Sequence, residues 1–427
     1  MIIAKEIEPN LAFVRCCISE KQCIPIITDW NALFAFMKEQ ALLGVGFHGI
    51  ERMKKEGVDV PRNVLLQWYA VSEQIKQRNV LMNKRCVELV EMLKKDGFES
   101  CILKGQGNTV MYGLGFRDDD ENPNLHPAPN DTLNPNDTLN GNFHPSTFQS
   151  FSSSSNLGML RQSGDIDVFV MPMAGSMVEG FEFRTGSVHK PDMTIEQRRK
   201  VVMEYVRRRF PLAKIRYQHI DYPVYPDVEV EMHFIPTAKN NPIYNRRLQR
   251  WVEGRMAEQC HHFVELPGGA GQVATPTVEF NVIYQLSHLM HHFFDEGIGL
   301  RQMMDYYFLL KAKNGLGFRD ENIERTLRYL GLYKFAGAVM WVLHEVFGLE
   351  EKFYIVPTDE WRGKLLLEEI IKGGNFGHFS GLTDHSIGTK YFLKIKRNMR
   401  FVRAYPAEAL CEPVFRTWHF FWRLLNG

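Results

Sequence analysis

The stretch LRQSGDIDVFV, residues 160–170, decides how the rest of the chain is interpreted. Its second half alternates as a β-strand does, so Asp165 and Asp167 project from one face while Ile166 and Val168 pack on the other. Two carboxylates side by side repel each other, and burying them without a partner is costly. A divalent cation resolves this conflict, since Mg²⁺ binds one or two carboxylates together with substrate phosphates. The apolar run at residues 168–170 predicts a buried strand, which favours a metal site over an exposed edge with two solvated aspartates.

A second alternating stretch, VEVEMHF at residues 228–234, predicts another strand with polar groups on one face. Glu229, Glu231 and His233 share that face. If this strand lies beside the aspartate strand, a third carboxylate joins the cluster as a metal ligand or a general base. Glu231 is preferred over Glu229 because it is nearer the strand centre, although any half-exposed antiparallel strand alternates in this way. The preceding stretch IRYQHIDYPVY, residues 215–225, predicts its antiparallel neighbour.

A glycine-containing turn follows another apolar run. Residues 101–107, CILKGQG, predict the end of a short buried strand, the pair Lys104-Gly105 and the start of a helix. A glycine turn at a helix start offers backbone N–H groups to phosphate oxygens. The Walker A pattern GxxxxGK[ST] does not occur, so this turn is a weak signal by itself. Together with the two aspartates it predicts a phosphate-binding site.

Between these motifs the composition changes sharply. In residues 117–156, Asn, Pro, Ser and Asp fill more than half of the positions, and PNDTLN occurs twice in tandem. Such a segment cannot bury enough apolar surface to offset the ordering of its backbone, so we expect a flexible surface insertion. Closure entropy grows only slowly with loop length. We therefore expect residues 101–116 and 157–171 to lie side by side.

The rest of the chain predicts helices around a small α+β core. Apolar residues recur at helical spacing through residues 1–95, which predicts an N-terminal helical region. Residues 96–240 hold the strands, the insertion and a helix that Thr194 opens, with Gln197 at the spacing of a capping box. Residues 241–427 are mostly helical in pattern. We expect three regions in this order, with the chemistry in the middle one.

Length and composition exclude several classes of protein. The 427 residues suffice for two or three domains. Hydrophobic residues make up 44% and charged residues 24%, which is typical of globular proteins, and a net charge of +1 gives no overall attraction to nucleic acid or an anionic membrane. The sequence has no apolar run long enough for a transmembrane segment, and the acidic residues near its start lead us to expect no secretion signal. Its seven cysteines form no CxxC pair, so we expect buried thiols in the cytoplasm.

Taken in order, LKGQG, RQSGDID and VEVEMHF resemble the motifs of the uncharacterised nucleotidyltransferase family of bacteria, a branch of the DNA polymerase beta-type nucleotidyltransferase superfamily. In that family a strand ending LKG is followed by R-x-S-G-D-I-D and later by an E-x-H strand. The resemblance covers roughly residues 28–345 and implies a small mixed sheet of nucleotidyltransferase type flanked by helical regions. Two features depart from the pattern: the interval between the first two motifs is unusually long, and Lys-Gly replaces the superfamily's commoner Gly-Ser.

The resemblance also implies roles for individual residues. Asp165 and Asp167 would hold the metal ions, and Glu231 would be the third catalytic carboxylate and metal ligand. The implied nucleotide-binding residues are Lys104, Gly105, Gln106, Arg161, Ser163 and Gly164. The implied cofactor is Mg²⁺, as two ions, with Mn²⁺ as the alternative.

The expected activity is the transfer of a nucleoside monophosphate from an NTP, with ATP preferred, to an acceptor hydroxyl, with release of pyrophosphate. A small metabolite or sugar is the expected acceptor, because the composition shows no strong basic groove for nucleic acid. One alternative is a toxin-like enzyme that modifies RNA or protein, for which the basic residues 390–403 are the only support. Another is a non-catalytic descendant of the fold, which the intact aspartate pair argues against.

Two further segments admit two interpretations each. The family places a His/Arg/Asp group in HLMHHFFDEGIGLRQMMDYY, so His288, Arg301 and Asp305 either border the nucleotide or form internal hydrogen bonds. Near the C-terminus, the basic residues 390–403 and the aromatic residues in 416–423 either meet an anionic partner or membrane, or belong to helices docked on the body of the protein. We favour the internal role in both cases.

Overall fold

The computed structural model describes residues 2–18, 24–114, 154–173, 177–178, 181–182, 193–315, 322–375 and 387–426. The predicted insertion at 117–156 lies outside the described residues, except for its last three positions. Among the residues described, no helix combines the length and the apolar character needed to cross a membrane.

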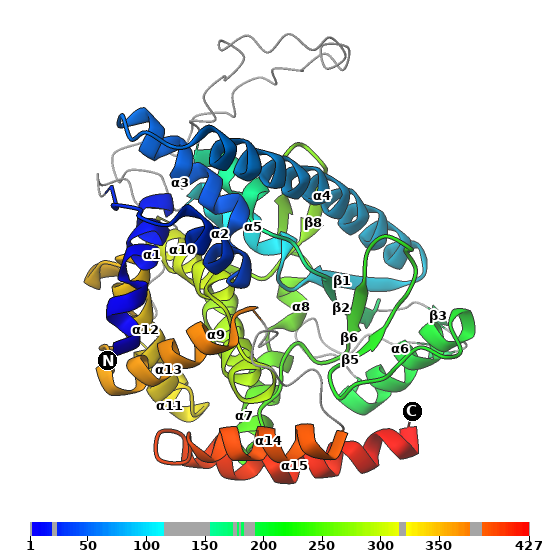
Figure 1. Ribbon diagram of the computed structural model, residues 1–427. Coiled ribbons are helices and arrows are strands. Elements are labelled where there is room, and N and C mark those ends of the chain that lie inside the picture. Colours follow the sequence, from blue (N-terminus) through cyan, green and yellow to red (C-terminus); the bar gives the residue numbers. More distant parts are fainter. Residues whose placement is uncertain are drawn as a thin grey trace.

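Helices surround a small sheet (Figure 1). Those before the sheet's second strand are α1 (Ile2–Ile18), α2 (Trp30–Glu39), α3 (Leu43–Lys55), α4 (Arg62–Lys95), α5 (Gln106–Leu114) and the 3-10 helix η3 (Ser154–Leu160). Those of the central part are α6 (Ile195–Arg209), α7 (Pro242–Glu253) and α8 (Met256–Gln259). The remaining ones are α9 (Val278–Asp295), α10 (Leu300–Gly315), α11 (Ile323–Tyr329), α12 (Tyr333–Phe347), the 3-10 helix η4 (Glu351–Phe353), α13 (Glu360–Gly373), α14 (Ile387–Met399) and α15 (Pro406–Asn426).

The main sheet has the strand order β1-β2-β6-β5. Its strands are β1 (Phe98–Ile102), β2 (Ile166–Pro172), β5 (His219–Asp221) and β6 (Val230–His233). The central pair β2 and β6 is parallel, and the two outer pairs are antiparallel. Two short antiparallel pairs complete the strands: β3 (Met177–Val178) with β4 (Phe181–Glu182), and β7 (Phe263–Glu265) with β8 (Gln272–Ala274). The α+β fold with a small mixed sheet between helices is confirmed.

The segments on either side of the insertion do lie side by side, as predicted. Strands β1 and β2 pair antiparallel, with Ile102 opposite Val168, and the Leu103 N–H donates to the Asp167 carbonyl at 2.9 Å. This pairing carries the turn after β1 to the start of β2. The first and second motifs therefore meet in space although the insertion separates them in sequence.

The two faces of the sheet are covered by different helices. On one face, the apolar side chains of β2 and β6 form a core with buried residues of α4 and α6. On the other face, Cys101, Leu103 and Phe169 join a larger core that also contains side chains of α1, α3, α9, α10 and α12. Figure 1 shows α4 along one side of the molecule, and α14 and α15 along the opposite side. The division into regions 1–95, 96–240 and 241–427 stays a prediction.

Helix α6 begins at the predicted capping box. The Gln197 N–H donates to the Thr194 hydroxyl at 3.2 Å, and the Thr194 N–H donates to Gln197 Oε1 at 2.8 Å. We expect Thr194→Ala to lower the free energy of unfolding by about 1 kcal/mol, the usual value for such a cap. Chemical denaturation measures this, with Thr194→Ser as the control that keeps the acceptor. An alanine variant as stable as the serine variant would contradict the prediction.

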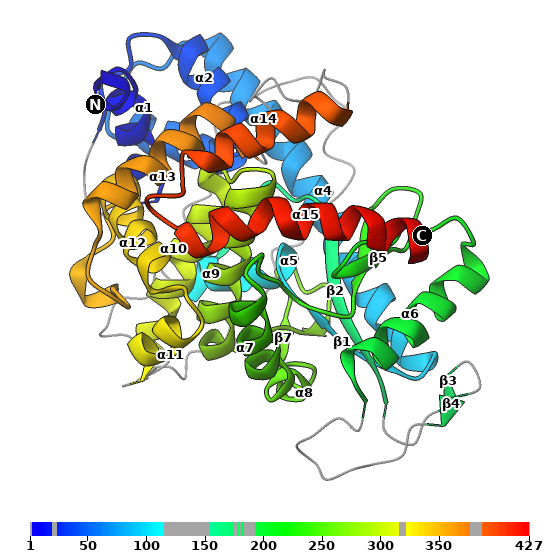
Figure 2. The same cartoon turned by 90° about the horizontal axis from the view of Figure 1, so that it is seen from below.

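Near the C-terminus, the basic residues of α14 and the turn after it form ion pairs with the body of the protein. Lys394 lies 3.5 Å from Asp295, and Arg397 and Arg400 lie 3.2 and 2.7 Å from Glu369. Figure 2 shows α15 lying across the body in front of α9. These contacts support the interpretation of docked helices.

Candidate active site

The three predicted carboxylates come together on one face of the sheet. Parallel pairing places Asp167 of β2 directly opposite Glu231 of β6. Side-chain oxygens of Asp165, Asp167 and Glu231 lie within 4.8 Å of one another. Glu229 is exposed and lies outside this cluster. The cluster exists because alternate residues of a strand share a face, so the residues between the acids supply the core on the other side.

Asp167 lies at the buried centre of this cluster, where its side chain is only 1% exposed. Lys104 Nζ lies 3.1 Å from its Oδ2, and His233 Nε2 lies 3.0 Å from its Oδ1. Burial alone would raise the pKa of Asp167, but these two neighbours lower it below its ordinary value. The carboxylate is thus held ionised by positive charge on both sides.

The two cationic neighbours respond to the same carboxylates. Burial alone would lower the pKa of Lys104, but the three acids raise it above its ordinary value. Burial would likewise lower the pKa of His233, but its hydrogen bonds to Asp167 and Glu231 raise it to about 9. Across the hairpin, burial and then the charge of His233 lower the pKa of His219 well below its ordinary value. The site therefore places a charged and a neutral imidazole next to each other.

The turn after β1 presents Lys104 to the cluster. Gly105 has a φ of +63°, in the left-handed region that glycine adopts without strain. A Cβ built at this position would lie 3.6 Å from the Asp165 carbonyl oxygen, so the turn runs close beside the start of β2. Two N–H groups of the turn, those of Gly107 and Asn108, donate to the carbonyls of Lys104 and Gly105. They are therefore already used within the turn.

A buried ion pair fixes the other side of the site. The Arg161 guanidinium donates from Nε and Nη2 to both oxygens of Asp305, each at 2.7 Å. The Tyr112 hydroxyl donates to the same carboxylate at 2.6 Å. Arg301 Nη1 donates to the Gln162 carbonyl at 2.8 Å. Burial, and then the charge of Arg161, lower the pKa of Arg301 to about 10, so an incoming anion would stabilise its charged form.

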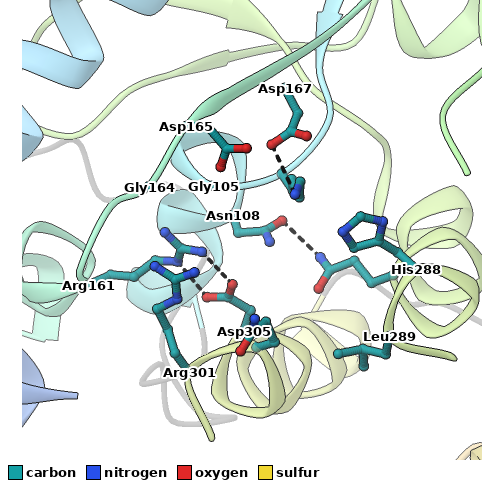
Figure 3. Close-up of a pocket in the computed structure, with 13 residues that line it drawn as sticks. Gly105, Asn108, Arg161, Gly164, Asp165, Asp167, His288, Leu289, Arg301 and Asp305 are labelled. Atoms are coloured by element: carbon teal, nitrogen blue, oxygen red, sulfur yellow. Dashed lines mark hydrogen bonds and ion pairs between the residues drawn. The ribbon is translucent and has the colours of Figure 1, made fainter. Parts of the chain in front are cut away.

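These groups line a small pocket. Its lining residues are Lys104, Gly105, Asn108, Arg161, Gly164, Asp165, Asp167, Gln285, His288, Leu289, Arg301, Gln302 and Asp305. Figure 3 shows Asp165 and Asp167 on one side of it and Arg161, Arg301 and Asp305 on the other. The pocket thus has two aspartates at one end, and two guanidinium groups with a third carboxylate at the other.

Two of the predicted nucleotide-binding residues do not line this pocket. Gln106 is buried and donates to Asn83 Oδ1 of α4. Ser163 lies in the loop before β2, where its hydroxyl is buried and finds no hydrogen-bond partner among the described residues. Lys104, Gly105, Arg161 and Gly164 do line it. The pocket is also lined by His288, Arg301 and Asp305. Arg301 and Asp305 form internal hydrogen bonds as well, so both interpretations of these two residues are correct.

Several residues of the site were not predicted. Asn108 of α5 accepts a hydrogen bond from Gln285 of α9 at 2.8 Å, which closes the pocket between two helices. His219 of β5 lies 3.3 Å from Glu231. In the sequence, His219 is marked only by its alternation with Asp221. This pattern does not give the register of β5 against β6. For Asn108 and Gln285 the sequence offers no signal, because helices far apart in the chain bring them together.

The donor set fits a hard divalent cation. Asp165, Asp167 and Glu231 offer only oxygen ligands, as Mg²⁺ prefers. Asp167, although almost fully buried, has one oxygen facing a lysine and the other a histidine, so positive charge already compensates this cluster. A cation bound there would supply the same compensation. The acidic cluster is therefore a candidate metal site.

Comparison with known proteins identifies part of this architecture. No curated protein and no solved structure matches the chain. A family match begins after β1 and the Lys104-Gly105 turn, and it includes β2, β6, α9 and α10. All three clustered carboxylates lie within it. Residues 158–348 match the model of the family described as uncharacterised nucleotidyltransferase, which confirms over this stretch the family resemblance expected from the motifs.

Proposed function

We propose that the protein transfers a nucleoside monophosphate from an NTP, ATP first of all, to an acceptor hydroxyl and releases pyrophosphate. The observation that carries the proposal is the convergence of Asp165, Asp167 and Glu231 beside the Lys104 turn, within a stretch that matches a nucleotidyltransferase family. In such a transfer, the acceptor oxygen forms a bond to the α-phosphorus and the bond from that phosphorus to the β-phosphate oxygen breaks.

The side chains divide the work by position. Asp165, Asp167 and Glu231 would hold Mg²⁺, as two ions or with Mn²⁺ instead, which when bound supplies charge neutralisation for the triphosphate. Lys104, now against Asp167, is placed to turn its ammonium to a phosphate oxygen. Arg301 lines the same pocket and supplies further positive charge, while Asp305 orients Arg161. The Glu231 side chain is 30% exposed, whereas that of Asp167 is 1% exposed. Glu231 would therefore accept the proton of the acceptor hydroxyl.

Labelled substrate tests the reaction class. The protein is incubated with Mg²⁺, a cell extract as the source of acceptors and either α-labelled or γ-labelled ATP, and the product that carries label is located. We expect transfer of the α label and release of the γ label in pyrophosphate. Transfer of the γ label would show a phosphoryl transferase instead. Lack of either transfer, both with ATP and when each of the other three labelled NTPs replaces it, would support the non-catalytic alternative.

Lys104 offers a second test of the same site. We expect Lys104→Met, which keeps the length of the side chain and removes its charge, to weaken NTP binding by about tenfold to a hundredfold, the usual value of a hydrogen bond to a charged group. Calorimetry with Mg²⁺ present measures the affinity. Lys364→Met is the control and should bind as wild type, because the Lys364 side chain of α13 is exposed and lies outside the pocket. Unchanged binding by Lys104→Met would remove the lysine from the phosphate site.

Two finer points belong to the proposal. A small-molecule acceptor is favoured over RNA or protein, because residues 394, 397 and 400 of the basic stretch are engaged in ion pairs with Asp295 and Glu369. A cytoplasmic location is supported by the cysteines of the described part, which are all free thiols and mostly buried.

A further inference from the structure

A second cluster of ligand atoms adjoins the three carboxylates. In the antiparallel pair of β5 and β6, His219 lies directly opposite His233, and Asp221 lies opposite Glu231. His219 Nδ1 is 3.3 Å from Glu231 Oε2, and His233 Nε2 is 3.4 Å from the same oxygen. The two ring nitrogens and the carboxylate oxygen all lie within 4.8 Å of one another. Two imidazoles and one carboxylate thus converge on a common point.

The outer nitrogen of His233 also has an acceptor, because His233 Nδ1 lies 3.2 Å from the Ile235 carbonyl oxygen. The outer nitrogen of His219 lies 3.8 Å from Asp221 Oδ1, which is beyond hydrogen-bond distance but leaves the carboxylate next to the ring. Metal-bound histidines in proteins characteristically donate the outer N–H to a carbonyl or a carboxylate in this way. With its proton on the outer nitrogen, a neutral imidazole turns a lone pair inward. His219 can offer such a lone pair as it stands, and His233, whose Nε2 now faces Asp167, would offer one when a bound cation displaces the proton between them.

We propose that His219, Glu231 and His233 bind a divalent transition metal of the zinc class. Imidazole nitrogens favour zinc, cobalt, nickel or iron over Mg²⁺, which prefers oxygen. Bonds of 2.0–2.1 Å to zinc in a tetrahedral site imply ligand atoms about 3.3–3.4 Å apart. The distances from Glu231 Oε2 to the two ring nitrogens already have these values.

The surroundings of the cluster suit such a site. Asp167 Oδ1 lies 3.0 Å from His233 Nε2, so the histidine cluster directly adjoins the acidic one. The side chains of His219 and Glu231 are 16% and 30% exposed, which leaves a path for the metal from solvent. Glu231 belongs to both clusters, so it would bridge the transition metal and the oxygen-only site of Asp165 and Asp167. Metal binding here does not depend on nucleotidyl transfer and is measurable without any nucleotide.

Cobalt is the probe, because Co²⁺ in a tetrahedral site with nitrogen ligands absorbs visible light far more strongly than octahedral Co²⁺ bound by oxygen. The full chain is freed of metal with a chelator and titrated with Co²⁺ in the presence of excess Mg²⁺. We expect one equivalent to give an intense visible band that Zn²⁺ removes by displacement. A spectrum no stronger than that of aqueous Co²⁺ would overturn the proposal.

Variants locate the ion. Loss of an outer partner of a metal-bound histidine usually costs 10–100-fold in affinity, so loss of a ligand should cost at least about 100-fold. We expect this for His219→Ala, and for His219→Gln should the alanine variant fail to show a cooperative melting transition. His261→Ala is the matched control, because His261 is 63% exposed and lies outside both clusters. Asp165→Asn should keep the band. Wild-type cobalt affinity in both His219 variants, or loss of the band in Asp165→Asn with retention in His219→Ala, would place the ion in the acidic cluster and refute the histidine site.

Discussion

Glu231→Gln is expected to leave Mg²⁺-dependent NTP binding within a few-fold of wild type while lowering turnover by roughly 10²–10⁴, the usual contribution of a positioned acid or base. The reason is its position. Asp167 lies buried between Lys104 and His233, whereas Glu231 is partly exposed on the open side of the cluster. In the proposed reaction it would therefore face the acceptor rather than the triphosphate. Calorimetry gives the affinity, and pyrophosphate release gives the turnover once an acceptor has been found.

Glu229→Gln is the matched control for this variant. Glu229 is two residues away in the same sequence pattern, but it is exposed and lies outside the cluster. We expect wild-type turnover from it. Near-normal turnover of Glu231→Gln would remove Glu231 from the catalytic group, and a comparable loss in Glu229→Gln would show that the effect comes from the charge of the hairpin as a whole.

Asp305→Ala is expected to have the largest effect on stability, about 3–5 kcal/mol in the free energy of unfolding. This is the usual cost of removing one partner of a buried ion pair, because the other charge stays buried without compensation. Asp305 and Arg161 are each 5% exposed, and Tyr112 donates to the same carboxylate. Their contacts join the loop before β2 to α10 and α5. Urea denaturation followed by circular dichroism measures the change.

The control for Asp305 is an exposed ion pair. Glu204 and Arg208 of α6 lie 3.0 Å apart, with side chains 43% and 57% exposed. Glu204→Ala should therefore change the free energy of unfolding by less than about 1 kcal/mol. If Asp305→Ala were no more destabilising than Glu204→Ala, the buried pair would not be what holds the loop before β2 in place.

The features that the sequence predicted well depend only on residues that lie close together in the chain. Alternation by two residues placed Asp165, Asp167 and Glu231 on one face and the apolar core on the other, because side chains of a strand alternate whatever the strand packs against. The capping box of α6 is equally local and was predicted to the residue. From the composition of residues 117–156 we predicted that the segments on either side lie together, and the pairing of β1 with β2 confirms this.

The features that the sequence did not predict depend on contacts between distant segments. Gln106 follows the Lys104-Gly105 turn, but its side-chain amide donates to Asn83 of α4. A buried amide needs a hydrogen-bond partner, and here α4 supplies it. The pairing of Arg161 with Asp305 spans 144 positions. His219 reaches Glu231 only through the register of a hairpin. In each case the residue type was visible in the sequence, but its neighbour was set by packing.

The most direct measurement of the proposed function is Mg²⁺-dependent NTP binding by Asp165→Asn compared with wild type. Asp165 lies in the acidic cluster and lines the pocket, so in the proposed function it would contact both the metal and the triphosphate. Calorimetry is done for both proteins with Mg²⁺ and again with a chelator, after the melting transition has shown that the variant is folded. We predict that wild type binds NTP only with Mg²⁺ and that Asp165→Asn binds far more weakly. Equal Mg²⁺-dependent binding by the two proteins would show that the metal site is elsewhere.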